Sequence, residues 1–175
     1  MRMSALTRWL AFWAALLSPI SAMAASDTNS AGLACRMGAP AKVAQGKSLP
    51  FKFGISNRGK KTVYVLTWNT PLEGFFGKSL RVIGPQGEVQ YRGAMVKRGA
   101  PGREDYVRIL PGATVWKNMD LATAYELGSD GEYEVTFVGR LHDVTTEKIP
   151  REMSKHAGAD VQCPALRFEI GSVAK

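Results

Sequence analysis

The sequence predicts an all-β protein, an antiparallel β-sandwich of about seven to eight strands with one short helical turn. Three observations lead to this fold class. Short stretches alternate apolar and polar residues, and Gly, Pro, Asn or Asp residues separate them at intervals of about ten residues. No long stretch has the spacing of an amphipathic helix. The composition, 45% hydrophobic and 22% charged, is that of a globular chain rather than a disordered one.

The N-terminus has the organisation of a secretory signal peptide over residues 1–24. Two arginines precede the apolar residues 9–17, and residues 22–24, Ala-Met-Ala, form a small-x-small cleavage motif. An uncleaved membrane anchor is the alternative, but Pro19 interrupts the apolar stretch, which is short for a membrane span. We therefore expect export to the periplasm or the medium, with no stable membrane insertion after signal cleavage.

Removal of the signal peptide leaves 175 less 24, or 151, residues, which suits one domain with a hydrophobic core. We expect a flexible N-terminal segment over residues 25–40 and a single sandwich domain over residues 41–171. The two cysteines of the chain, Cys35 and Cys163, lie near the two ends of the mature protein.

A distant cysteine pair in an exported protein indicates one disulfide bond, which would join the first segment to the last. Redox and zinc sites are disfavoured because neither Cys35 nor Cys163 lies in a CxxC motif. A lipid anchor on Cys35 is disfavoured because residues 32–34 are a poor lipidation context.

The first strands of the domain are expected over residues 49–56 and 62–68. The first stretch alternates apolar with polar residues, and the second is rich in β-branched and aromatic residues. Because residues 57–61 supply Asn, Gly and charge for a turn, we expect the two strands to form a hairpin.

Two further hairpins are expected across turns that contain Pro and Gly. They would pair residues 80–83 with 88–91 and residues 106–110 with 114–119.

The C-terminal half should contain a short helix and two more strands. Residues 120–127 have helical spacing for one or two turns, whereas residues 131–138 and 166–170 alternate again. Tyr133 has the position of a tyrosine corner, with ordinary core packing as the alternative. The polar connection over residues 142–162 is long enough to be either functional or disordered.

No catalytic, cofactor or metal residue is expected, and we predict that the protein is not an enzyme. His142 and His156 are the only histidines, and no HExxH, GxSxG, P-loop or GxGxxG motif is present. His142 and Asp143 are neighbours, and neighbours on a strand point to opposite faces.

Basic residues give the whole chain a net charge of +8. One cluster comprises Arg58, Lys60 and Lys61, and a second comprises Arg92, Lys97, Arg98, Arg103 and Arg108. Nucleic acid is not an expected partner, because an exported protein rarely meets it and aromatic residues do not interleave with these charges. Attraction to an acidic partner fits better.

A series of short motifs occurs in a characteristic order along the chain. The motifs are NTPLEG at 69–74, YRG at 91–93, VKRG at 96–99, EDY at 104–106, DLxxAYxL at 120–127 and GxYxV at 131–135. Over about residues 41–140 the chain resembles the N-terminal prodomain of bacterial deuterolysin-like and peptidyl-Lys metalloendopeptidases. The resemblance implies a small Ig-like sandwich that assists folding of a zinc peptidase domain and keeps it inactive. The HExxH and GTxDxxYG motifs of that peptidase domain are absent from this sequence.

Two functions remain open at this point. In the first, the protein is an inhibitor or folding partner of a secreted zinc metalloendopeptidase, and a basic loop and an apolar loop contact it. The candidate contact residues are Arg92, Lys97, Arg98 and Tyr106 in the basic loop, and Leu72, Phe75 and Phe76 in the apolar loop. A basic side chain such as Lys97 would fit an acidic pocket in a peptidase that cleaves beside Lys. In the second, the protein is a periplasmic Ig-like binding or assembly module with no peptidase partner.

Overall fold

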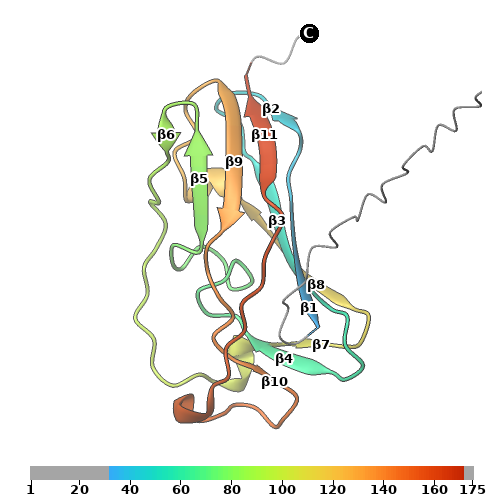
Figure 1. Ribbon diagram of the computed structural model, residues 1–175. Coiled ribbons are helices and arrows are strands. Elements are labelled where there is room, and N and C mark those ends of the chain that lie inside the picture. The colour runs from blue at the N-terminus through green and yellow to red at the C-terminus, as the bar shows by residue number, and fades with distance from the viewer. Residues whose placement is uncertain (1–31, 172–175) are drawn as a thin grey trace, which may run out of the picture.

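The all-β prediction is confirmed by a computed structural model, which describes residues 32–171 (Figure 1). The expected signal peptide and the start of the expected flexible segment lie outside these residues. The described chain forms eleven strands in three sheets: sheet A (β1 Leu33–Gly38, β3 Pro50–Asn57, β8 Thr114–Asp120), sheet B (β2 Lys42–Val43, β11 Leu166–Ile170, β9 Gly131–Phe137, β5 Leu80–Gly84, β6 Gly87–Glu88) and sheet C (β10 Val144–Thr145, β4 Val63–Leu66, β7 Tyr106–Ile109). The described helical elements are three single 3₁₀ turns: η1 Arg103–Asp105, η2 Leu121–Thr123 and η3 Met153–Lys155.

Sheets A and B pack against each other and enclose the main core. Phe51, Phe53 and Ile55 form the inner row of β3, and all three are buried. The ring centroid of Phe53 lies 5.2 Å from that of Phe137 on β9, so the two sheets meet at this pair. Burial of each such side chain contributes about 1.5–3 kcal/mol to the free energy of unfolding.

Two of the expected hairpins are wrong, because the chain changes sheets at their turns. β3 pairs with β1 and β8, whereas β4 pairs with β7 and β10. The buried Asn57 side chain donates to the carbonyls of Lys61 and Ile109, which fixes the corner where β3 gives way to β4. Residues 106–110 and 114–119 are separated in the same way, into sheet C and sheet A.

The remaining local predictions are confirmed in part or in full. β5 and β6 form the expected hairpin, but β6 ends at Glu88. Asp120 caps η2 by accepting a hydrogen bond from the Ala122 N–H, and the turn ends at Thr123 rather than near Gly128. β9 and β11 form and pair with each other.

The two alternatives for Tyr133, a tyrosine corner and ordinary core packing, occur together. Its side chain is buried and stacks on the ring of Phe168, with 5.3 Å between the centroids. Its hydroxyl donates to the carbonyl of Ser129, four residues upstream, at 2.8 Å, which is the contact of a tyrosine corner.

The prediction of a flexible segment over residues 25–40 is wrong for residues 33–38, which form β1. Residues 33–38 form an edge strand of sheet A, and Leu33 and Cys35 are buried in the core. Its apolar residues follow one another instead of alternating, so the sequence pattern alone does not reveal the strand. The 142–162 connection likewise has structure of its own, because it contains β10 and η3.

The disulfide bond between Cys35 and Cys163 is confirmed. It joins β1 of sheet A to the segment that leads into β11 of sheet B, and 128 residues separate the two cysteines. The bond therefore holds both ends of the described chain and both layers of the sandwich together.

We expect the double substitution Cys35→Ala with Cys163→Ala to lower the free energy of unfolding by about 3–5 kcal/mol, because the cross-link restricts the unfolded chain over a long loop. Urea unfolding of the oxidised protein and of the variant measures the difference. Equal midpoints and slopes would show that the bond contributes nothing to stability.

Candidate functional site

Two long connections lie side by side along one flank of the molecule. The connection over residues 67–79 links β4 to β5, and the connection over residues 89–102, which we call the basic loop, links β6 to η1. In Figure 1 the basic loop runs down the left edge from β6 to the end that carries sheet C, and the 67–79 connection coils between β4 and the base of β5. Contacts of Tyr91 with Phe75 and of Arg98 with Glu73 join the two connections. These connections contain most of the residues that the sequence singled out.

An aromatic cluster holds the upper part of both connections against the core. The buried ring of Tyr125 makes edge contacts with Phe75 and Tyr91, at centroid distances of 6.3 and 5.4 Å. The Tyr91 hydroxyl donates to the carbonyls of Phe75 at 2.8 Å and Ala94 at 2.9 Å. Burial raises the pKa of both Tyr91 and Tyr125, so both hydroxyls remain protonated donors.

A second set of contacts, which we call the clamp, fixes the lower part of the basic loop. The Arg98 guanidinium donates to the Glu73 carboxylate and lies over the Trp68 ring, 5.3 Å from the centroid. The Glu73 side chain is only 8% exposed and also accepts a hydrogen bond from the Asn69 N–H at 2.8 Å. Burial raises the pKa of Glu73, and the Asn69 N–H and Arg98 oppose that rise. Arg98 therefore serves the loop itself.

Between these two anchors the basic loop presents three consecutive side chains to solvent. Met95 is 75% exposed and Val96 is 42% exposed, and Lys97 is exposed as well. We call these three residues the loop apex. Two apolar side chains and one cation, held on a loop that is fixed on both sides, form a surface suited to contact with another protein.

The structure separates the candidate contact residues into two groups. Exposed side chains are Lys97 in the loop apex, Arg92, which pairs with Glu126 at 2.5 Å, and Phe76, which is 45% exposed. The other four make internal contacts: Leu72 and Tyr106 are buried, Phe75 belongs to the aromatic cluster, and Arg98, although partly exposed, belongs to the clamp.

Tyr106 is unsuited to partner contact because it supports a buried polar network at sheet C. Its hydroxyl donates to Asp143 at 2.9 Å, and burial together with that carboxylate raises the pKa of Tyr106 to about 12. Asp143 is fully buried, accepts the Ala157 N–H at 2.9 Å and lies 3.6 Å from Arg151. As expected, His142 points away from Asp143 toward solvent.

Sequence reasoning missed Asp143, although a signal was present. Leu141, Asp143 and Thr145 are buried and alternate with the exposed His142 and the half-buried Val144, so the strand period places the carboxylate on the buried face. The network ties the 142–162 connection to β7, which explains why that connection has structure.

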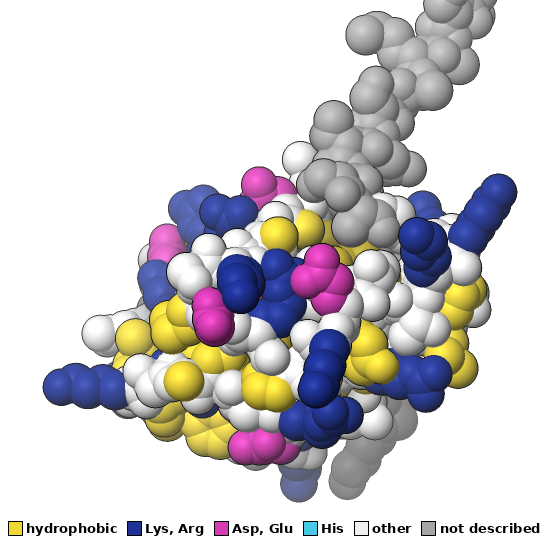
Figure 2. Space-filling model, turned by 90° about the horizontal axis from the view of Figure 1, so that it is seen from below, with side chains coloured by type: hydrophobic (Ala, Val, Ile, Leu, Met, Phe, Trp, Pro, Cys, Tyr) yellow, Lys and Arg dark blue, Asp and Glu magenta, His cyan; other side chains and the backbone are white. Residues whose placement is uncertain are grey.

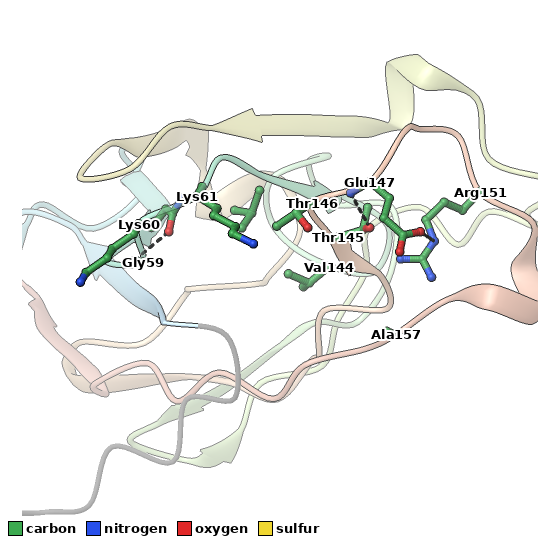
Figure 3. Close-up of a pocket in the computed structure, with 11 residues that line it drawn as sticks. Gly59, Lys60, Lys61, Val144, Thr145, Thr146, Glu147, Arg151 and Ala157 are labelled. Carbon is green, nitrogen blue, oxygen red and sulfur yellow. Dashed lines mark hydrogen bonds and ion pairs between the residues drawn. The ribbon is translucent and has the colours of Figure 1, made fainter.

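An open groove of about 530 Å³ lies beside the network, between the turn that follows β3 and β10. In Figure 3 the Glu147 carboxylate lies against Arg151 at one end, and Lys60 points away from the groove. Figure 2, a view of this end of the molecule, shows Lys and Arg side chains spread around it with apolar side chains between them.

Within residues 32–171 no group of three or more His, Cys, Asp or Glu residues could hold a metal ion.

Comparison with known proteins gives one partial sequence relative. No protein-family model matches the chain. An extracellular protease of Aeromonas hydrophila is 28% identical over 85 residues, which are 48% of this chain and 24% of that protein. The similar region thus spans about a quarter of the protease.

Solved structures with a similar arrangement of strands are only distantly alike. They include Escherichia coli alpha-2-macroglobulin, from its domain MG7 to the C-terminus, with a TM-score of 0.41 and 11% identity over 80% of this chain and 16% of that one. A CARDB domain from Pyrococcus furiosus has a TM-score of 0.33 and 11% identity over 79% of this chain and 92% of that one. No helix among residues 32–171 is long and apolar enough to span a membrane.

The clamp can be tested by a substitution that keeps its shape and every basic residue. Glu73→Gln removes the charge that Arg98 contacts and should cost the closed loop about 1–2 kcal/mol. A hydrogen bond to a charged group contributes about 1.5–3 kcal/mol, and the neutral bond that replaces it contributes only about 0.5–1.5 kcal/mol. We expect trypsin to cleave after Lys97 about five to thirty times faster.

Glu126→Gln is the matched control, because it removes the carboxylate partner of Arg92 from an exposed ion pair of little energetic weight. Its cleavage rate after Lys97 should equal that of the unmodified protein. Equal rates in Glu73→Gln and the unmodified protein would show that the clamp does not hold the loop.

Proposed function

We propose that this protein is an exported, non-catalytic binding protein that acts on a secreted zinc metalloendopeptidase, as its inhibitor or its folding partner. The loop apex makes the central contact. The observation that carries the proposal is the fixed basic loop, which exposes Met95, Val96 and Lys97 while the next residue, Arg98, is held in the clamp.

Preorganisation is the physical reason for assigning binding to this loop. A segment that is already ordered loses less conformational entropy on binding than a mobile one. The aromatic cluster and the clamp supply that order from both sides of the loop apex. Phe76 is 45% exposed and follows Phe75, whose carbonyl accepts a hydrogen bond from Tyr91 of the basic loop, so Phe76 offers a second apolar contact near that loop.

The choice of partner rests on two similarities and one charge. The ordered motifs resemble a peptidase prodomain, and part of the chain is similar to part of an extracellular protease. The Lys97 ammonium complements an acidic pocket, which a peptidase that cleaves beside Lys would offer. A disulfide-bonded domain also fits an oxidising compartment outside the cytoplasm.

The direct test is titration of a secreted zinc metalloendopeptidase that cleaves beside Lys with the purified protein. We expect reduced peptidase activity, or a higher yield of refolded peptidase, at micromolar concentrations. Lys97→Ala should weaken the effect at least tenfold, because a buried interfacial side chain of this kind contributes about 1.4 kcal/mol or more.

Lys148→Ala provides the control, since Lys148 is an exposed lysine outside the basic loop. It should retain full potency. An unchanged potency in Lys97→Ala would remove the loop apex from the proposal, and no effect on activity or refolding would exclude the peptidase partner itself.

A further inference from the structure

The outer face of sheet A carries an exposed tryptophan that lies on a glycine. Trp116 on β8 and Gly54 on β3 are opposite each other in the strand register. A Cβ atom at position 54 would lie 2.5 Å from Cε3 of the indole, so only glycine leaves room for the ring. The ring is therefore laid against the strand, and Trp116 remains 42% exposed.

Two cations lie on the same face of sheet A as this ring. Lys52 Nζ lies 5.1 Å from the centroid of the Trp116 ring, and Arg36 on β1 is opposite Gly54 on its other side. Arg36 thus lies two strand spacings from Trp116, about 10 Å across the sheet. Lys52 and Arg36 are both exposed.

Acidic residues do not balance these cations within the strands of sheet A. At outward-facing positions the three strands carry Arg36 and Lys52, whereas Lys117 is opposite the inward-facing Phe53. The single acidic residue of these strands is Asp120. The Asp120 carboxylate already accepts hydrogen bonds from the N–H groups of Leu49 at 2.8 Å and Ala122 at 3.0 Å. The outer face of sheet A is therefore cationic around an exposed aromatic ring.

Sheet B shows the opposite arrangement on its exposed positions. Neighbouring strands and turns there form ion pairs: Lys42 with Glu169 at 3.0 Å, Arg167 with Glu134 at 2.7 Å, and Arg81 with Glu88 at 3.1 Å. These ion pairs neutralise the charges of sheet B within the protein, so its exposed side chains need no external partner. Within the described residues, the cations on the outer face of sheet A are not neutralised in this way, which indicates that this face binds an anion.

We propose that the outer face of sheet A binds an anionic polysaccharide, a chain of pyranose rings that carry carboxylates. The apolar face of one ring stacks on the indole of Trp116, and carboxylates of the chain pair with Arg36 and Lys52. The exposed indole matches the apolar C–H face of a pyranose ring, and the cations match the charge of the carboxylates. This binding is independent of the loop apex and of the proposed peptidase partner.

Affinity electrophoresis through gels that contain polygalacturonate, dextran or polyglutamate tests the proposal. Polygalacturonate offers rings and charge, dextran offers rings alone, and polyglutamate offers charge alone. We expect the strongest retardation with polygalacturonate. Trp116→Ala should weaken that binding at least tenfold and leave the weak retardation by polyglutamate unchanged.

Arg36→Gln should also weaken binding to polygalacturonate severalfold. Arg167→Gln is the matched control, because it removes one arginine from an exposed strand position of sheet B. Circular dichroism checks that each variant is folded. Equal retardation by polyglutamate and polygalacturonate, or polygalacturonate binding that Trp116→Ala leaves intact, would overturn the proposal in favour of general attraction between a basic protein and any polyanion.

Discussion

The position of the candidate site depends on the burial of one tyrosine. Tyr125 is almost completely buried, so its hydroxyl requires a partner, which is the carbonyl of Leu80 at the start of β5, at 2.8 Å. That hydrogen bond fixes the ring, and the ring edges receive Phe75 and Tyr91 from the two neighbouring connections. The path of both connections is therefore determined by the core of the sandwich.

The clamp extends the same order to the far side of the basic loop. Burial of a carboxylate lowers the stability of a protein unless a cation pairs with it. Arg98 is the cation that pairs with the nearly buried Glu73, and the same guanidinium covers the Trp68 ring. Side chains that look equivalent in the sequence thus acquire different roles. Lys97 and Arg98 are adjacent cations, yet Lys97 extends into solvent and Arg98 holds the loop.

The sequence predicted the features that depend on local pattern and missed those that depend on distant pairing. Alternation located β3, β9 and β11, and the cysteine spacing indicated the disulfide bond. Alternation specifies which face of a strand is buried but not which strand lies beside it, so two hairpins were wrong. For the site, the sequence identified both loops. It could not show that Leu72 and Tyr106 are buried or that Arg98 is paired with Glu73, because both properties are set by contacts with distant parts of the chain.

Hydrogen–deuterium exchange of the protein, alone and with an inactivated secreted zinc metalloendopeptidase, tests the central claim most directly. The account predicts that amide exchange slows in residues 93–99 when the peptidase is added, and that exchange in sheet B does not change. Unchanged exchange in residues 93–99, with protection elsewhere or nowhere, would contradict the assignment of the loop apex as the binding site.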